Sequence, residues 1–336
     1  MSIAKDRQAA QAHKLGIVVI GRNEGERLAR CLKSLAPLDV PIVYADSSST
    51  DDSVSLARAA GVTVVQLSAR EVPLNAARGR NAGFEALQRQ MPDVAFVQFI
   101  DGDCLIEEGW ISTGLDHLSA NPKSAVACGR RREAQPDASF YNRLADEEWA
   151  TPVGRAQECG GDSIMRVAAL DEVGLFDPGL TAGEEPELCS RLRGAGWEIW
   201  RLDAAMTVHD MAMFRIGQWF RRARRSGYGY AQAYRRTRRS NRPLYGVQLR
   251  SAVLWAALLP AATIILTLVS GRIGALLPLP IIYLMQIARM AAHRGIGSFD
   301  SWRYAALMLL SKGPELVGAI EGFAGEARRK QSGQGS

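Results

Sequence analysis

The sequence predicts an α/β protein whose sheet is largely parallel, followed by an apolar helical part toward the carboxyl end. Three observations support this fold class. β-branched runs alternate with helical patterns up to residue 100. The expected strands end in loops rich in polar and acidic side chains. Beyond residue 250, charged side chains almost disappear from a long apolar stretch.

Four short apolar runs have the length and β-branched content of buried strands. They span residues 16–20, 42–45, 62–67 and 94–100. Leucines recur at helical spacing after the first run, residues 47–53 supply helix-capping side chains, and a further helix is expected over residues 75–89. Strands that alternate with helices in this way favour a parallel sheet covered on both faces.

Polar side chains follow three of these strands where each strand ends. Asn23 and Glu24 follow the first, Asp46 the second, and Asp101 and Asp103 the fourth. Because parallel strands end at one edge of a sheet, we expect these groups to converge there, where α/β proteins bind ligands. A carboxylate pair separated by glycine suits a hard divalent cation.

Arg80 and Asn81 lie near the start of the helix expected over residues 75–89, where a guanidinium and free backbone N–H groups favour anions. The first strand is not followed by Gly-x-Gly-x-x-Gly, and the chain has no Gly-Lys-Ser/Thr loop. Dinucleotide and P-loop sites therefore lose support.

The five cysteines are single and lack metal-type spacing, which favours reduced thiols in a cytosolic setting. Residues 1–14 are polar and lack the apolar core of a signal peptide, so we expect the part before the apolar stretch to stay in the cytoplasm.

Several motifs occur in an order that resembles family 2 glycosyltransferases. They are Arg22-Asn23-Glu24, Asp46-Ser-Ser-Ser-Thr-Asp51, Arg80-Asn81-Ala82-Gly83, Asp101-Gly102-Asp103, and the downstream segments 160–166 and 183–188. The resemblance covers roughly residues 14–210. It implies the GT-A fold and a nucleotide-diphosphate sugar as donor.

The resemblance also implies roles for single residues. Asp46 and Arg80 would hold the nucleoside and Asp101 its ribose. Asp103 would ligate Mg²⁺ or Mn²⁺ at the diphosphate, and His209 lies where the family often has a histidine near the metal. A bound cation would stabilise the charge that develops on the leaving nucleoside diphosphate.

Transfer to a hydroxyl also needs a general base. Family position points to Glu185, although the family usually has aspartate at that place. Glu184 could share the role, and repulsion between the two neighbours would raise the pKa of one of them.

A basic segment precedes the apolar stretches. Residues 214–242 contain ten arginines and no acid, so the rest of the chain carries about −4 of the net +6. Residues 251–269 and 273–288 are apolar runs that could form a transmembrane hairpin. Arginines outside both ends put those ends in the cytoplasm, and the basic, aromatic segment fits a helix lying on anionic lipid.

We therefore expect a catalytic domain over residues 1–211, a basic interfacial region over 212–250, and the hairpin over 251–290. Within residues 291–336 we expect an amphipathic helix (302–320) and a disordered tail (325–336). The prediction is an inverting, metal-dependent glycosyltransferase at the inner membrane, with a cytoplasmic catalytic domain and a lipid-linked or glycan acceptor. A polyprenyl-phosphate sugar transferase and an inactive protein that binds nucleotide sugar or anionic lipid are the alternatives. We expect no nucleic-acid partner.

Overall fold

The computed structural model describes residues 2–68, 74–240 and 242–331. The chain divides into two compact units, Met1–Phe214 and Arg215–Ser336. The first boundary predicted from the sequence lies within a few residues of this division. Each unit is described by itself below.

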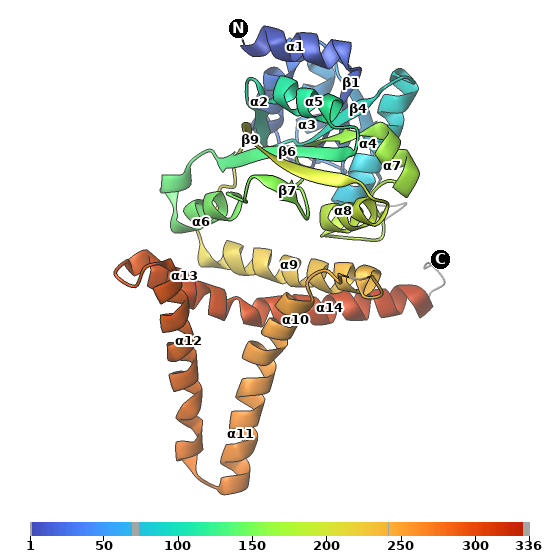
Figure 1. Cartoon of the computed structure of the whole chain (residues 1–336). Coiled ribbons are helices and arrows are strands. Elements are labelled where there is room, and N and C mark those ends of the chain that lie inside the picture. Colours follow the sequence, from blue (N-terminus) through green and yellow to red (C-terminus); the bar gives the residue numbers. More distant parts are fainter. Residues whose placement is uncertain (1, 69–73, 241, 332–336) are drawn as a thin grey trace. The chain divides into compact units, whose positions relative to one another are not determined.

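One mixed sheet organises the first unit (Figure 1). Its strands are β1 (Leu15–Gly21), β2 (Ile42–Asp46), β3 (Thr63–Gln66), β4 (Phe96–Asp101), β5 (Cys104–Ile106), β6 (Ser124–Glu133), β7 (Gly154–Ala156), β8 (Ser163–Arg166) and β9 (Glu198–His209). They are ordered β3-β2-β1-β4-β8-β6-β9-β5, with β7 beside β9. The first four strands are parallel, as predicted, whereas β8 runs antiparallel to both of its neighbours.

Helices cover both faces of the parallel half. In the first unit they are α1 (Ser2–Ala12), α2 (Glu26–Leu35), α3 (Ser53–Ala59), α4 (Ala76–Gln90), α5 (Trp110–Ala120), α6 (Phe140–Glu148), α7 (Val167–Val173) and α8 (Glu184–Gly194). Right-handed crossovers carry the chain outward through α2 and α3 and back through α4, which places α4 on the opposite face. A Cβ at Gly83 would lie 2.5 Å from Val18 of β1, so glycine permits the close approach of α4 to the sheet.

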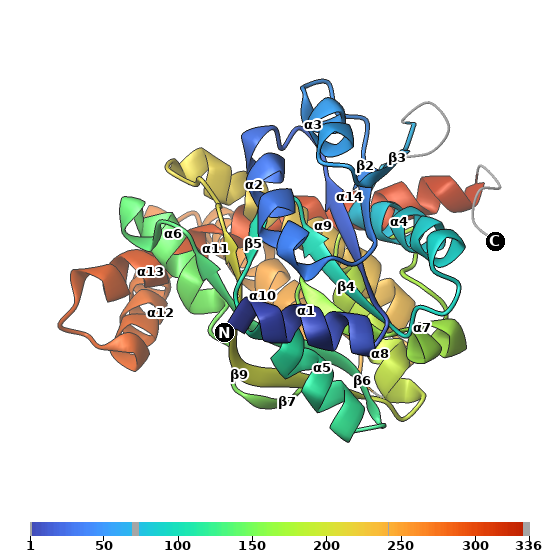
Figure 2. The ribbon, with the colours of Figure 1, turned by 90° about the horizontal axis from the view of Figure 1, so that it is seen from above.

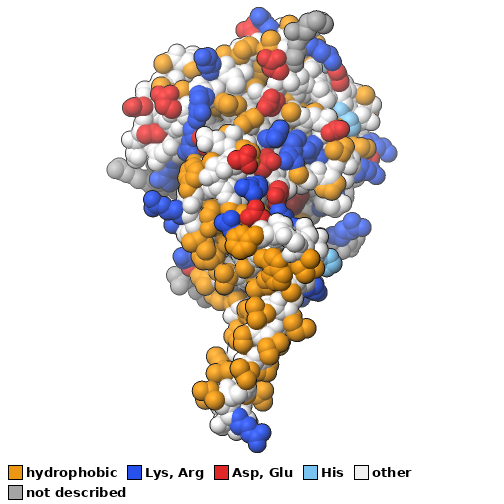
Figure 3. All heavy atoms as spheres, turned by 90° about the vertical axis from the view of Figure 1, so that its left-hand side faces the viewer, with side chains coloured by type: hydrophobic (Ala, Val, Ile, Leu, Met, Phe, Trp, Pro, Cys, Tyr) orange, Lys and Arg blue, Asp and Glu red, His pale blue; other side chains and the backbone are white. Residues whose placement is uncertain are grey.

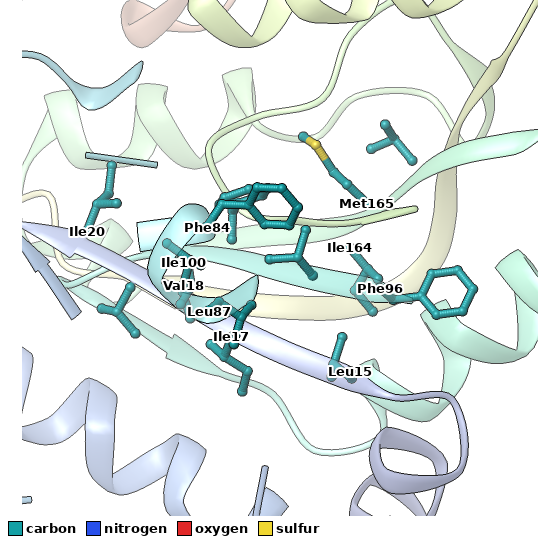
Figure 4. Close-up of a cluster of buried hydrophobic side chains, with 14 of the residues drawn as sticks. Leu15, Ile17, Val18, Ile20, Phe84, Leu87, Phe96, Ile100, Ile164 and Met165 are labelled. Atoms are coloured by element: carbon teal, nitrogen blue, oxygen red, sulfur yellow. The ribbon is translucent and has the colours of Figure 1, made fainter. Parts of the chain in front are cut away.

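The core lies between α4 and the middle of the sheet. Val18 and Ile100 come from adjacent strands, and Phe84 and Leu87 from α4, and all four are buried (Figure 4). Ile164 brings β8 into the same cluster. This packing fixes β1, β4 and β8, the strands beside which the candidate site is built.

The helix α1 was not predicted. It packs beside α5 and caps the N-terminus of that helix (Figure 2). Asp6 of α1 is buried and accepts hydrogen bonds from the backbone N–H groups of Gly109 (2.6 Å) and Ser112 (2.8 Å). A carboxylate from outside α5 therefore caps its first turn, a pairing that local sequence patterns do not reveal.

The second unit is helical. It contains α9 (Ile216–Thr237), α10 (Gly246–Val253), α11 (Leu259–Ser270), α12 (Pro278–Arg294), α13 (Phe299–Leu310) and α14 (Lys312–Gln331). Two continuous helical segments, Gly246–Ser270 and Ile273–Arg294, are long and apolar enough to cross a membrane. Hydrophobic side chains cover this hairpin in the space-filling view (Figure 3).

Two expectations for this unit are wrong. The helix predicted over residues 302–320 is broken at Ser311, whose hydroxyl accepts a hydrogen bond from the Trp219 indole (2.8 Å) and donates one to the Leu307 carbonyl (2.7 Å). The tail predicted to be disordered from residue 325 continues α14 as far as Gln331, and residues 332–336 lie outside the described part. At the first of these departures, Ser311 packs against Trp219 of α9, a helix distant in sequence.

Close packing of α9 and α14 depends on glycines from both helices. A Cβ at Gly318 would overlap the Arg224 carbonyl oxygen, and one at Gly227 would overlap that of Glu315. The two backbones therefore approach too closely for any side chain at these positions.

We expect Gly318→Ala to lower the free energy of unfolding by at least ~1–3 kcal/mol, because the new methyl group must push the helices apart. Gly313 of the same helix has open space around its Cβ position and provides the matched control. Gly313→Ala should leave stability unchanged or slightly higher. Thermal and denaturant unfolding of both variants in detergent would measure the difference, and equal stabilities would contradict the packing.

Candidate active site

The carboxyl ends of β2, β1 and β4 lie side by side. In the register of the parallel strands, Asp46 is opposite Gly21, and Asp101 is opposite Ile20. The predicted convergence of these strand ends at one edge of the sheet is confirmed. Acidic and basic groups from α4, α8, β6 and β9 surround the end of β4.

The centre of the site is the guanidinium of Arg80, whose side chain is only 3% exposed. It donates to Glu184 Oε1 (2.9 Å) and to Asp101 Oδ1 (3.1 Å), and it lies 3.0 Å from Glu185 Oε1. Burial alone would lower the pKa of Arg80, but these three carboxylates outweigh burial and raise it. Arg80 thus joins α4, β4 and α8 as a permanently charged link.

This geometry alters the role predicted for Arg80. A guanidinium that is almost completely buried and surrounded by three carboxylates does not fit direct contact with a nucleoside. It can instead position Asp101 and Glu185. The anions that Arg80 contacts near the start of α4 are supplied by the chain itself.

A second arginine, Arg131 of β6, holds the other side of Asp101. Its Nη2 donates to Asp101 Oδ2 (3.0 Å) and lies 2.7 Å from Asp162 Oδ2. Asp162 is fully buried and also accepts from the Asp101 backbone N–H (3.0 Å) and the Thr207 hydroxyl (2.7 Å). Burial alone would raise the pKa of Asp101, but Arg80 and Arg131 outweigh it and hold that pKa below its usual value.

Sequence reasoning missed Arg131, Asp162 and Thr207. Asp162 lies within the segment 160–166 that carried the family resemblance, but no role was assigned to it. The adjacent glycine is a further signal, because a Cβ at Gly161 would lie 2.7 Å from Arg80 Nη2 and 2.8 Å from Asp101 Oδ2. The glycine lets this loop pack directly on the buried ion pair.

Glu184 and Glu185 begin α8, where the positive end of the helix dipole favours acids. The Glu184 side chain is 7% exposed and accepts from Arg80, whereas the Glu185 side chain is 16% exposed. Burial, and then the neighbouring Glu184, raise the pKa of Glu185 to about 7. Of the two carboxylates, Glu185 therefore combines access to solvent with a pKa suited to accepting a proton near neutrality.

Asp103 and His209 meet because β5 and β9 pair with Cys104 opposite His209. His209 Nε2 lies 3.2 Å from Asp103 Oδ2. Its Nδ1 is buried without a hydrogen-bond partner among the described residues, and the Glu133 carboxylate lies 3.9 Å away, too far for a hydrogen bond. Burial would lower the pKa of His209, but Asp103 and Glu133 outweigh burial and raise it to about 9.

These residues fit a divalent cation. A carboxylate and an imidazole within contact distance are common ligands of divalent cations, and the buried Glu133 carboxylate lies behind the imidazole. Cys104 lies in the same cluster, but burial raises the pKa of its thiol well above the usual range, so it stays protonated and is a poor ligand. Asp103 and His209 are the oxygen and nitrogen donors of this cluster, and a metal would bind His209 in place of the proton that Asp103 and Glu133 stabilise on it.

Trp149 forms one side of this cluster. Its ring meets the His209 ring edge-on at 5.0 Å between centroids, and the Arg131 guanidinium lies 5.5 Å from its centre. Trp149 therefore restricts both His209 and Arg131, a contact that its position at the end of α6 does not reveal in the sequence.

The remaining predicted residues hold the loops around the site. Asp46 is fully buried and accepts from the Ser49 backbone N–H (2.9 Å), and Asn23 accepts from the Thr50 N–H (2.8 Å). The Asn81 amide binds the backbone N–H and carbonyl of Phe176. Glu24 pairs with Arg27 (2.8 Å), while burial and nearby Asp103 raise its pKa. Asp46 and Asn81 thus have structural partners that occupy the groups predicted to contact a donor.

Comparison with known proteins gives the fold. A mannosyltransferase from Pyrobaculum calidifontis, solved with GDP-mannose and Mn²⁺, superposes with a TM-score of 0.60 over 96% of this chain and 99% of its own, at 15% sequence identity. At that identity the likeness establishes only the fold, and the predicted GT-A fold is confirmed.

Two relatives with known names match part of this chain in sequence. Pre-mycofactocin glycosyltransferase of Mycobacterium tuberculosis is 27% identical over 229 residues, 65% of this chain, and the chain spans only 46% of that relative. Glycosyltransferase AglE of Haloferax volcanii is 20% identical over 247 residues, 70% of this chain and 79% of its own. Residues 16–168 match the family model of glycosyl transferase family 2, the family that the sequence motifs resemble.

Proposed function

We propose that the chain is an inverting, metal-dependent glycosyltransferase that moves a sugar from a nucleotide-diphosphate donor to a lipid-linked or glycan acceptor at the cytoplasmic membrane face. The observation that carries the proposal is the pairing of Glu185, with a pKa raised to about 7, with Arg80 beside the Asp103–His209 cluster. The match of residues 16–168 to glycosyl transferase family 2 supports the same chemistry. The donors named for relatives, such as GDP-mannose, suggest the substrate class but not the sugar.

On the acceptor side, Glu185 takes the proton of the attacking hydroxyl. The oxygen forms its bond to the anomeric carbon as the bond from that carbon to the donor phosphate breaks, which inverts the configuration. Arg80 holds Glu185 in place, and neighbouring Glu184 keeps the Glu185 carboxylate basic enough to accept the proton.

On the donor side, Asp103 and His209 would hold Mg²⁺ or Mn²⁺, which when bound supplies positive charge for the departing diphosphate. Asp101, fixed between two arginines, would orient the ribose. Asn23, Glu24 and Asp46 would shape the nucleoside site through the loops they hold, and Asn81 would act indirectly through the Phe176 loop.

The membrane part of the proposal rests on the second unit. Its two apolar helical segments are 25 and 22 residues long, and few of their residues are buried in the protein. Arginines lie outside both ends of the hairpin, which favours a cytoplasmic location for those ends and for the catalytic unit. We infer attachment to the inner membrane and an acceptor carried on lipid.

Replacing Glu185 by glutamine should lower turnover about 10²–10⁴-fold, the usual contribution of a general base. In the unsubstituted protein, activity should fall as the pH drops below about 7, because protonated Glu185 cannot accept a proton. Product formation from nucleotide sugars with Mn²⁺, followed by chromatography across pH 5.5–8.5, would measure both. An unchanged rate in the variant would contradict the assignment.

Stability provides the control for that variant. The native pKa of Glu185 lies above its ordinary value of 4.5, so the stabilisation linked to this group is present below pH 4.5 and is lost as the pH rises through about 7. Glu185→Gln should therefore melt at the same or a higher temperature than the parent at pH 8. A lower melting temperature would indicate a structural role.

Removal of Arg80 should have the opposite effect on stability. Arg80→Gln leaves three acids without their buried partner, so we expect a loss of ~3–5 kcal/mol at pH 8 and a smaller loss at pH 5, where those acids bind protons more readily. Without Arg80 the pKa of Glu185 should rise, so any remaining activity should begin to fall at a higher pH than in the unsubstituted protein. Arg7→Gln, in an exposed pair with Asp39, is the control and should change stability little.

The metal ligands can be tested without catalysis. Asp103→Asn should weaken Mn²⁺ binding at least about tenfold, whereas Cys104→Ser should leave it unchanged because the thiol stays protonated. Mn²⁺ titration followed by electron paramagnetic resonance measures both affinities. If the cysteine variant lost Mn²⁺ binding and the aspartate variant kept it, the metal would be bound by residues other than Asp103.

A further inference from the structure

The second unit contains an apolar groove that the proposed reaction does not use. It has a volume of about 810 Å³ and lies between α14 and the segment that runs from the end of α9 into α10. One wall is formed by Leu316, Ala319 and Phe323 of α14, and the other by Val253, Leu254 and Leu258. This volume falls within the range of small-molecule sites.

A local departure from α-helical geometry shapes one wall. Residues Leu254–Leu258 form a π-helical turn, in which the Leu259 backbone N–H bonds to the Leu254 carbonyl. Pro260 follows and has no N–H to donate, so the regular ladder is interrupted there. Such turns often occur at functional sites, and here both ends of the turn line the groove.

The apolar lining is partly open. Leu254 is 42% exposed, Leu258 57% and Phe323 37%, so the groove presents hydrocarbon surface that an apolar ligand would cover. Val253, Leu254 and Leu258 also belong to the apolar segment Gly246–Ser270. If that segment spans a bilayer, the wall of the groove continues into the hydrocarbon region, where lipid chains are the available partners.

The polar end of the groove is basic. Arg250 contributes to the lining and is exposed, and no ion pair is formed by it within the described residues. Residues 211–299 contain fourteen arginines and no aspartate, glutamate or lysine. A guanidinium beside an apolar groove matches a phosphate joined to a hydrocarbon chain.

We propose that this groove binds an acyl chain of an anionic membrane phospholipid, with the lipid phosphate at Arg250. The inference rests on the proposed membrane location and not on the transfer chemistry. The lipid is a bound component of the second unit rather than the sugar acceptor. It would fill exposed apolar surface at the point where α10 enters the apolar hairpin.

The test is native mass spectrometry of the purified full chain in detergent with phosphatidylglycerol or phosphatidylcholine added. The unsubstituted protein should retain phosphatidylglycerol in preference to phosphatidylcholine. Ala319→Phe places a ring in the groove and should weaken retention at least about tenfold, the loss expected when about two methylene groups leave it. Arg250→Gln should remove the preference for phosphatidylglycerol.

Two matched variants control for hydrophobicity and charge. Leu268→Phe adds a ring on α11 at a site that is already 76% exposed, and Arg272→Gln removes a charge beyond the end of that helix. Both should bind lipid as the unsubstituted chain does. Helical circular dichroism verifies folding, and if Ala319→Phe does not fold, the exposed Arg250→Gln decides.

Equal retention of the two lipids by the unsubstituted chain would overturn the proposal, as would unchanged retention in folded Ala319→Phe or in Arg250→Gln. Displacement of phosphatidylglycerol by an equimolar isoprenoid phosphate would also overturn it and assign the groove to a lipid acceptor. Glu185→Gln should keep the preference. Failure of the transfer chemistry and failure of the lipid site are therefore separate outcomes.

Discussion

The arrangement of the site depends on one buried guanidinium. Arg80 enters from α4 and joins the end of β4 to the start of α8 through Asp101 and Glu184. Buried acids so close together would repel one another and bind protons. With Arg131, the positive charge of Arg80 holds the pKa of Asp101 below its usual value, whereas burial and Glu184 outweigh Arg80 at Glu185 and raise its pKa to about 7.

Much of the parallel half could be predicted from the sequence, because its signals are local. Short β-branched runs indicate the strands. Because parallel strands end at the same edge of a sheet, Asp46 and Asp101 can be placed at one edge without knowledge of any contact. The antiparallel half gives no comparable signal. Arg131 and Asp162 reach Asp101 from strands separated from it by thirty to sixty residues, and only the observed pairing of β4, β8 and β6 brings them there.

The second unit shows the same limit. Apolar length predicted the hairpin helices, but Ser311 at the helix break accepts a hydrogen bond from an indole almost a hundred residues away. The glycines of α14 matter only because α9 packs against them. In a single sequence, Gly318 and Gly313 look alike. Their difference lies in the partner helix, which no periodicity of α14 describes.

Charge balance indicates what a cation would contribute to the donor site that we propose. Residues 1–210 contain 31 acidic and 22 basic side chains, a net charge of −9, whereas the chain as a whole is +6. Both arginines of the site are already engaged by Asp101, Asp162 and the α8 acids, so neither offers a free guanidinium to a phosphate. An anionic donor entering beside Asp103 would meet repulsion, which falls only as the inverse of distance and is stronger at low dielectric. A divalent ion on Asp103 and His209 would reverse the local sign, so the same acids that exclude a bare diphosphate can accept one together with its metal.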